Sequence, residues 1–146
     1  MTALLRHRPE LDEAKLQRTM ILINQAVPDC LVTGYGHLID QLSLPDPNDR
    51  HVLAAAIRCG AQVIVTTNLK DFPRKTLADF DINARHPDDF ILDLADLDPA
   101  IVTTAAKLQR AALENPPLSA ETFIGTRRRQ GLPGVAGLPQ SQIALI

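Results

Sequence analysis

The hydrophobic positions of this chain fall into a series of helical periods around one short buried strand. From Leu11 to Val27 the apolar residues recur close to a helical spacing. Further helical patterns cover Pro99 to Leu113, with Asp98 as N-cap, and residues 119 to 129, with Ser119 as N-cap. These patterns predict helices on both sides of the middle of the chain.

The most ordered pattern lies in residues 45 to 72, near the middle of the chain. A helix is predicted to begin at Asp46, with a proline at its first position, and to end at Gly60. The apolar run Val63 to Val65 is continuous rather than alternating, which is typical of a parallel strand covered on both faces. This stretch predicts a helix, a strand and then a polar loop.

Shorter elements are predicted on either side of this unit. Cys30 to Thr33 and Ile82 to Ala84 are strand candidates, and Lys75 to Phe80 is a short helix. Residues 37 to 42 are open between helix and loop. The segment His86 to Asp89 resembles a capped helix start.

The two ends of the chain give weaker patterns. Residues 1 to 10 are rich in charged residues and histidine, and we expect them to be the remainder of a preceding helix. From Gly131 onward glycine, proline and glutamine interrupt any period. We expect this tail to be loosely ordered or to dock weakly.

The composition fits one globular domain of 146 residues and excludes several classes of function. Aromatic residues make up 3% of the chain, which argues against a base-stacking surface, and a net charge of −2 argues against a polybasic membrane binder. Cys30 and Cys59 are isolated, so neither a zinc site nor a disulfide is expected. Without an apolar run of membrane-spanning length or a signal peptide, the expected location is the cytoplasm, with no membrane partner.

Charge is distributed unevenly along the chain. Between Ser43 and Ala100 there are ten acidic residues, all aspartate, against six basic ones. Aspartate is favoured at helix starts and turns, but this segment also offers carboxylates to a hard cation. After Ala100 the chain is net basic, and the run Arg127 to Arg129 is open between a contact with RNA phosphates and a solvated helix face.

The predicted helix and strand bring the two ends of the central unit together. A helix that runs back to a parallel strand begins at the edge where that strand ends, which is the usual ligand edge of an open sheet. Asp46 and Asp49 are therefore expected near Asn68 and Asp71. Their oxygen ligands suit Mg²⁺ or Mn²⁺. The alternatives are an N-cap for Asp46, a capping box for Asp49, and ordinary turn residues for the other two.

Two motifs in this unit resemble those of PIN domains, the VapC-like toxin ribonucleases in particular. The first reads Pro-Asp-x-x-Asp-Arg-His-Val-Leu-Ala-Ala-Ala from Pro45, and the second reads Val-Ile-Val-Thr-Thr-Asn-Leu-Lys-Asp-Phe from Val63. The later His86 to Phe90 and the helical tail resemble the subgroup with a C-terminal extension. The resemblance implies a Rossmann-like three-layer α/β/α sandwich and an Mg²⁺-dependent endoribonuclease of a toxin–antitoxin system.

The resemblance also implies roles for individual residues. Asp49 matches the third acidic ligand of the family, and Asp71 with Asn68 beside it matches the fourth. Thr66 matches the small hydroxyl residue that opens the same loop. By this resemblance Asp49 and Asp71 bind the metal, and Asn68 and Thr66 complete the catalytic set.

One departure from the family changes the expectation. PIN domains begin with an apolar strand that carries an aspartate, and a second acid follows, but no segment before Leu11 fits that strand. We therefore expect an N-terminally truncated PIN domain at residues 1–95 and a C-terminal helical extension at residues 96–146. The alternative to an RNA-cleaving enzyme is an inactive remnant that binds an antitoxin protein, and a homodimer is a further possible assembly.

Overall fold

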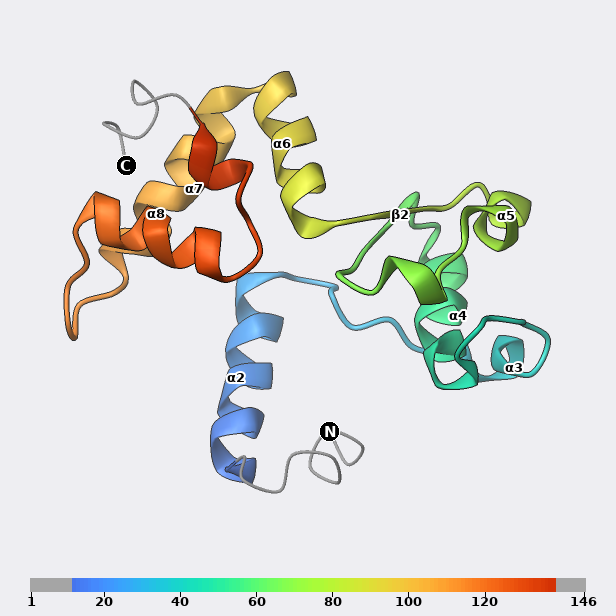
Figure 1. Cartoon of the computed structure of the whole chain (residues 1–146). Helices are drawn as coiled ribbons and strands as arrows, with labels where there is room; N and C mark the ends of the chain where they lie inside the picture. Colours follow the sequence, from blue (N-terminus) through green and yellow to red (C-terminus); the bar gives the residue numbers. More distant parts are fainter. Residues whose placement is uncertain (1–11, 139–146) are drawn as a thin grey trace.

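The computed structural model describes residues 12–138 as a small sheet with short helices beside it, followed by a group of C-terminal helices (Figure 1). Residues 1–11, which include the expected N-terminal helix remainder, and residues 139–146 lie outside this description. The α-helices and strands are α2 (Glu13–Ala26), α3 (Gly36–Ile39), α4 (Arg50–Cys59), β1 (Val63–Val65), α5 (Arg74–Leu77), β2 (Asn83–Arg85), α6 (Pro87–Leu97), α7 (Pro99–Ala111) and α8 (Ala120–Arg129). Short 3-10 turns are η1 (Pro47–Asp49), η2 (Leu69–Asp71), η3 (Ala78–Phe80) and η4 (Val135–Gly137).

Strands β1 and β2 form a two-stranded parallel sheet, as their separation by helix α5 requires. The register pairs Ile64 with Ala84, and these residues face the core. The prediction that β1 is covered on both faces is wrong for the described chain, because Val65 is 45% exposed. The β-branched run reflects strand propensity here, and only the Ile64 side of β1 is buried.

The hydrophobic core lies between helix α4 and the sheet. It consists of seven buried residues, namely Leu44, Leu53, Ala56, Ile64, Phe72, Leu77 and Ile82. Leu53 and Leu77 are fully buried. Because these residues come from α4, β1, α5 and the loops between them, the core fixes helix α4 against the end of β1.

The predicted helix from Asp46 to Gly60 is present as turn η1 followed by α4, so the α-helix itself begins three residues later than predicted, and local chemistry explains both ends. Asp46 caps turn η1 by accepting a hydrogen bond from the backbone N–H of Asn48 at 2.8 Å, and α4 continues from that turn. At the other end Gly60 adopts a left-handed conformation with φ of 68°, which glycine tolerates without steric cost. The predicted short helix before Phe80 is also present, as α5 and η3.

Helices α6, α7 and α8 begin at the residues that the sequence predicts. His86, Asp98 and Ser119 each accept a hydrogen bond from a backbone N–H in the first turn of the helix that follows. Helix α6 packs on α7 and is joined to the sheet by an ion pair between Arg85 and Asp93.

The expectation of a weakly docked tail is wrong for the residues that the structure describes there. The buried carboxylate of Asp88 accepts hydrogen bonds from the backbone N–H groups of Gly134 and Val135, at 2.7 and 2.9 Å. These bonds hold η4 against the first turn of α6. The sequence pattern does not reveal this contact because its partners are 46 and 47 positions apart.

Two further predictions on the N-terminal side are corrected or resolved. The candidate strand Cys30 to Thr33 is an irregular segment, because no strand among the described residues pairs with it. The open segment at residues 37–42 contains the end of the short helix α3. Cys30 and Cys59 are free thiols, and both are exposed.

The mixed α/β class with a parallel sheet and C-terminal helices is confirmed. The described residues hold one two-stranded sheet, so the three-layer arrangement of a PIN domain is not seen in this part of the chain. Across residues 12–138, every helix falls short of the length or the apolar character that crossing a membrane requires.

Candidate metal centre

The candidate site lies where the first turn of helix α4 meets the loop that follows β1. Asp49 ends turn η1 directly before α4, and Asp71 ends turn η2 after β1. Because the core packs α4 antiparallel to β1, the start of the helix and the end of the strand lie at the same edge. Two residues that are 22 positions apart in the sequence are thereby brought together.

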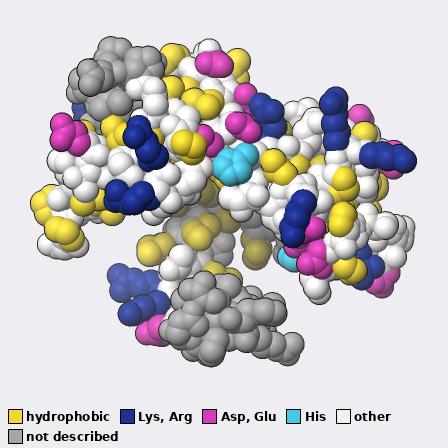
Figure 2. Space-filling model, in the orientation of Figure 1, with side chains coloured by type: hydrophobic (Ala, Val, Ile, Leu, Met, Phe, Trp, Pro, Cys, Tyr) yellow, Lys and Arg dark blue, Asp and Glu magenta, His cyan; other side chains and the backbone are white. Residues whose placement is uncertain are grey.

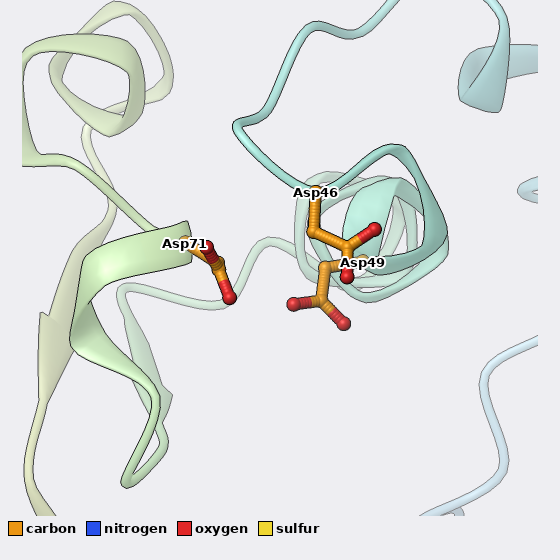
Figure 3. Close-up of side chains that lie close together, drawn as sticks. All are labelled: Asp46, Asp49 and Asp71. Atoms are coloured by element: carbon orange, nitrogen blue, oxygen red, sulfur yellow. The ribbon is translucent and has the colours of Figure 1, made fainter.

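Three carboxylates converge at this edge, from Asp46, Asp49 and Asp71 (Figure 3). One oxygen of each residue lies within 4.8 Å of an oxygen of each of the other two, and all three residues are half-buried. In the close-up, Asp71 faces the pair formed by Asp46 and Asp49 across an open space.

Asn68 links the two sides of the cluster. Its side-chain nitrogen Nδ2 donates a hydrogen bond to Oδ2 of Asp71 at 2.5 Å and a longer one to Oδ2 of Asp49 at 3.4 Å. Thr66 supports Asn68, because its hydroxyl oxygen accepts a hydrogen bond from the backbone N–H of Asn68 at 3.0 Å. The structure therefore brings Asp49, Asn68 and Asp71 into contact and places Thr66 as a support of the loop.

The family resemblance gives Asp46 no role as a ligand, although the geometry of the central unit already places it at this edge. Its cap function is real, since Oδ1 accepts both the backbone N–H and the side-chain amide of Asn48, at 2.8 and 3.0 Å. Both of these bonds use Oδ1, so Oδ2 is left for another ligand. Pro47 and Asn48 separate Asp46 from Asp49, and turn η1 places both carboxylates on the same side. The N-cap pattern alone does not indicate this arrangement.

The capping-box alternative for Asp49 finds no support in the structure. A capping box would have the Asp49 carboxylate accept the backbone N–H of the N-cap residue Asp46, and no such hydrogen bond is found among residues 12–138. Its observed partner is the amide of Asn68 in the opposite loop. The side chain is thus directed across the site instead of along its own helix.

The electrostatics of the cluster favour a cation. Three carboxylates within 4.8 Å of one another repel each other. No lysine or arginine among residues 12–138 forms a salt bridge with Asp46, Asp49 or Asp71, and the guanidinium of Arg85 pairs with Asp93 instead. A hard divalent cation with oxygen ligands is the group that this donor set suits.

The donor set is wider than a closed metal site. With an Mg–O bond of about 2.1 Å, neighbouring ligands of an octahedral ion are about 3.0 Å apart and opposite ligands about 4.2 Å apart. The oxygens of Asp46, Asp49 and Asp71 lie within 4.8 Å of one another. The three carboxylates can therefore surround such an ion after they move inward.

An open groove of about 720 Å³ lies beside the site and does not include the three aspartates. Its floor is the open side of the sheet, with Val63 and Arg85, and its walls include Leu69 and Leu94. Arg85 hydrogen-bonds Asp93 in this groove, and that bond and the charge of Asp93 raise the pKa of the Arg85 guanidinium. Arg85 is therefore committed to an ion pair with α6.

The arginine run of helix α8 makes mostly local contacts. The Arg127 guanidinium lies over the Phe123 ring, 4.6 Å from its centre, and Arg128 donates a hydrogen bond to the carbonyl of Ala136 at 3.4 Å. Arg129 bonds the hydroxyl of Thr126 in the same helix. These contacts favour the interpretation of Arg127 to Arg129 as a helix face. The hydrogen bond from Arg128 to Ala136 also helps to hold the tail.

Comparison with known proteins connects the chain to one family. Residues 87–140 match the family model described as the VapC50 C-terminal domain. A stretch of 64 residues, 44% of this chain, is 56% identical to the protein named "Putative ribonuclease VapC50" of Mycobacterium tuberculosis. That stretch spans 37% of the relative's length. No solved structure matches the chain.

The family match and the structure agree on the C-terminal unit. The matched residues begin at the first residue of α6 and contain the whole Asp88 contact with Gly134 and Val135. The acidic cluster lies before this stretch, on the part of the chain that carries the two PIN-like motifs. The C-terminal part of the chain is therefore similar to the VapC50 C-terminal domain, and a 64-residue stretch of the chain is similar to a protein named as a putative ribonuclease VapC50.

Proposed function

We propose that this chain is a metal-dependent endoribonuclease of toxin–antitoxin type, which hydrolyses phosphodiester bonds of RNA at the edge formed by α4 and β1. The observation that supports this most directly is the acidic cluster, in which oxygens of Asp46, Asp49 and Asp71 lie within 4.8 Å of one another. The cation is Mg²⁺ or Mn²⁺, and the fold around it is that of a PIN domain.

In this proposal Asp49 and Asp71 are the metal ligands, and Asp46 is a third carboxylate on the same side. When bound, the ion supplies a Lewis acid that lowers the pKa of water and neutralises phosphate charge. Asn68 holds the carboxylates of Asp49 and Asp71 at a fixed separation, and Thr66 fixes the backbone of Asn68. The ligands are thus oriented before the ion arrives.

In this proposal the two parts of the chain have different roles. Residues 1–95 form the partial PIN domain with the site, and residues 96–146 form the helical extension. RNA is the substrate, an antitoxin protein is the partner, and the location is cytoplasmic. The similarity to the protein named "Putative ribonuclease VapC50" supports the ribonuclease class.

The test is cleavage of RNA by the purified chain with Mn²⁺, compared with the variants Asp49→Asn and Asp96→Asn. Asp96 is an exposed aspartate of α6 outside the cluster, so its variant controls for the loss of one charge. We expect cleavage by the wild type and by Asp96→Asn, and at least roughly a hundredfold loss in Asp49→Asn. Equal cleavage by all three proteins would show that the activity arises elsewhere or from a contaminant.

A second candidate is an inactive remnant that binds an antitoxin protein. It is favoured by exposed apolar residues at the end of α6 and along α7, where Leu97, Ile101 and Leu108 are 83%, 60% and 67% exposed. Such a surface is typical of protein–protein contacts. Absence of Mn²⁺ binding together with a stoichiometric complex with the antitoxin would favour this candidate over the nuclease.

A further inference from the structure

The groove on the open side of the sheet shares a wall with the candidate metal centre. We call this groove of about 720 Å³ the sheet groove. The three-residue turn η2 contributes Leu69 to the groove and Asp71 to the acidic cluster, so one short turn borders both features. A chain molecule that is held at the cluster can therefore reach the groove by crossing this turn.

The lining of the sheet groove carries a net positive charge. It includes two arginines, Arg74 and Arg85, and one acid, Asp93. Because Arg85 and Asp93 form a salt bridge, their charges compensate each other. Arg74 is exposed, and its guanidinium forms no hydrogen bond or salt bridge with any other residue of the range 12–138. Figure 2 shows basic side chains in dark blue over the part of the molecule that carries α5 in Figure 1. Arg74 is thus the uncompensated charge of the groove, and an anionic ligand complements it.

The remaining lining suits one flat apolar group. Leu69 and Leu94 are 41% and 37% exposed and Phe90 is half-buried, so all three offer apolar surface to a ligand. A nucleobase stacks on an aromatic ring such as that of Phe90 through its π face. Pockets for small ligands have volumes of roughly 300–1,000 Å³, so the groove has room for one nucleotide. The low aromatic content of the chain excludes an extended stack, but a single base needs only one ring.

Asn83 supplies a polar group that can recognise the edge of such a base. It lies in β2 opposite Val63, and both residues line the groove. Its backbone N–H donates a hydrogen bond to the carbonyl of Gln62 at 2.9 Å, which fixes its position in the sheet. Its exposed side-chain amide has no hydrogen-bond partner within the described part of the chain. A carboxamide offers both a donor and an acceptor, as recognition of a base edge requires.

We propose that the sheet groove is a subsite for one nucleotide of single-stranded RNA, next to the phosphodiester bond at the metal centre. The base lies against Phe90 with its edge toward Asn83, and Arg74 binds a phosphate of the same nucleotide. This inference rests on the proposed nuclease function and adds the residues that select the sequence. Arg74 contributes affinity for any RNA, whereas Asn83 determines which base is preferred.

The first experiment measures RNA binding in the absence of cleavage. Fluorescence anisotropy of a labelled single-stranded RNA of about eight nucleotides is recorded with the full chain in EDTA, at several salt concentrations. The variants are Arg74→Gln and Lys75→Gln, which each remove one positive charge from α5, although Lys75 is exposed and does not line the groove.

We expect the wild type and Lys75→Gln to bind alike, and the dissociation constant of Arg74→Gln to be at least roughly fivefold higher. The dependence of log Kd on log salt concentration should also be shallower by about 0.7 in Arg74→Gln, because one phosphate contact is lost. Absence of binding by the wild type, or equal weakening in both variants, would overturn the proposal.

The second experiment tests the selection of a base. Affinities for RNAs composed only of adenine, cytosine or uracil nucleotides are compared in the wild type, Asn83→Ala and Gln109→Ala. Gln109 is an exposed amide of α7 outside the groove. We expect the wild type and Gln109→Ala to share one order of preference, and Asn83→Ala to reduce the ratio between the best and the worst RNA by at least roughly fivefold. A wild type without a preference, or an unchanged preference in Asn83→Ala, would contradict recognition by Asn83.

These measurements distinguish the subsite from the nuclease itself. If Asp49→Asn abolishes cleavage while Arg74→Gln binds and cleaves RNA like the wild type, the nuclease stands and the subsite is wrong. If binding depends on Arg74 but the wild type does not cleave RNA, the subsite stands and the nuclease is wrong. Circular dichroism verifies that each variant keeps the helical content of the wild type.

Discussion

The carboxylate of Asp88 accepts the backbone N–H of Gly134 at 2.7 Å, across 46 residues of chain. The same carboxylate accepts the N–H of Val135 at 2.9 Å, and Asp88 is 7% exposed. A buried carboxylate that receives two backbone donors is well satisfied, and it ties the end of the described chain to helix α6. This contact lies within residues 87–140, which match the VapC50 C-terminal domain.

Replacement of Asp88 by alanine is therefore expected to destabilise the protein. The change leaves two N–H groups, of Gly134 and Val135, without their acceptor, which costs roughly 1–3 kcal/mol of unfolding free energy. Urea unfolding measures the change. The matched control is Asp89→Ala, an exposed acid in the same turn of α6, whose unfolding free energy should change by less than about 1 kcal/mol. Equal losses in both variants would show that the helix dipole, and not the tail contact, is responsible.

Gly134 is expected to tolerate no side chain. A Cβ atom at this position would lie 2.7 Å from Cδ1 of Leu92 and 2.9 Å from Oδ2 of Asp88. Gly134→Ala should thus lower the unfolding free energy by roughly 1–3 kcal/mol, as overpacking does. Gly137→Ala is the control, because a Cβ there meets no atom within 4 Å. A wild-type melting temperature for Gly134→Ala would contradict the close packing of the tail.

The core of the central unit gives a third expectation. Leu53 is fully buried between α4 and the sheet, so Leu53→Ala should cost about 2–5 kcal/mol of unfolding free energy. Leu108→Ala removes the same atoms from a residue that is 67% exposed, and it should change the unfolding free energy by less than about 0.5 kcal/mol. Chemical denaturation distinguishes the two, and a similar small effect at both positions would be inconsistent with the described core.

Asp46 has two roles that one substitution separates. Asparagine is as good an N-cap as aspartate, so Asp46→Asn should keep the hydrogen bonds to Asn48 and leave the unfolding free energy within about 0.5 kcal/mol of the wild type. It also removes one of the three carboxylates of the cluster. We expect Mn²⁺ to raise the melting temperature less in Asp46→Asn than in the wild type. An identical Mn²⁺ effect would limit Asp46 to capping.

The central αβ unit was predictable because its signals are local. Asp46, Pro47 and Gly60 fix the ends of the helix by short-range chemistry, and Val63 to Val65 is a strand by propensity. The closeness of Asp49 and Asp71 follows from the geometry of such a unit. Their roles as metal ligands stay predictions.

The features that sequence reasoning missed are those that depend on tertiary contacts. The residues Cys30 to Thr33 have strand-like side chains, but a strand forms only where a neighbour supplies hydrogen bonds. The docking of the tail depends on Asp88, but the sequence around Asp88 indicates only an acidic residue in the first turn of a helix. The exposure of Val65 depends on which residues cover that face of the sheet, and a run of β-branched residues does not indicate them.

The most direct test of the proposed metal site is a calorimetric titration of the full chain with Mn²⁺. The wild type is expected to bind the ion, and Asp49→Asn and Asp71→Asn should each raise the dissociation constant by at least roughly tenfold, since each removes one carboxylate ligand from the cluster. Asp96→Asn should bind like the wild type. Equal affinity in all four proteins, or no binding by the wild type, would contradict a metal centre at Asp49 and Asp71.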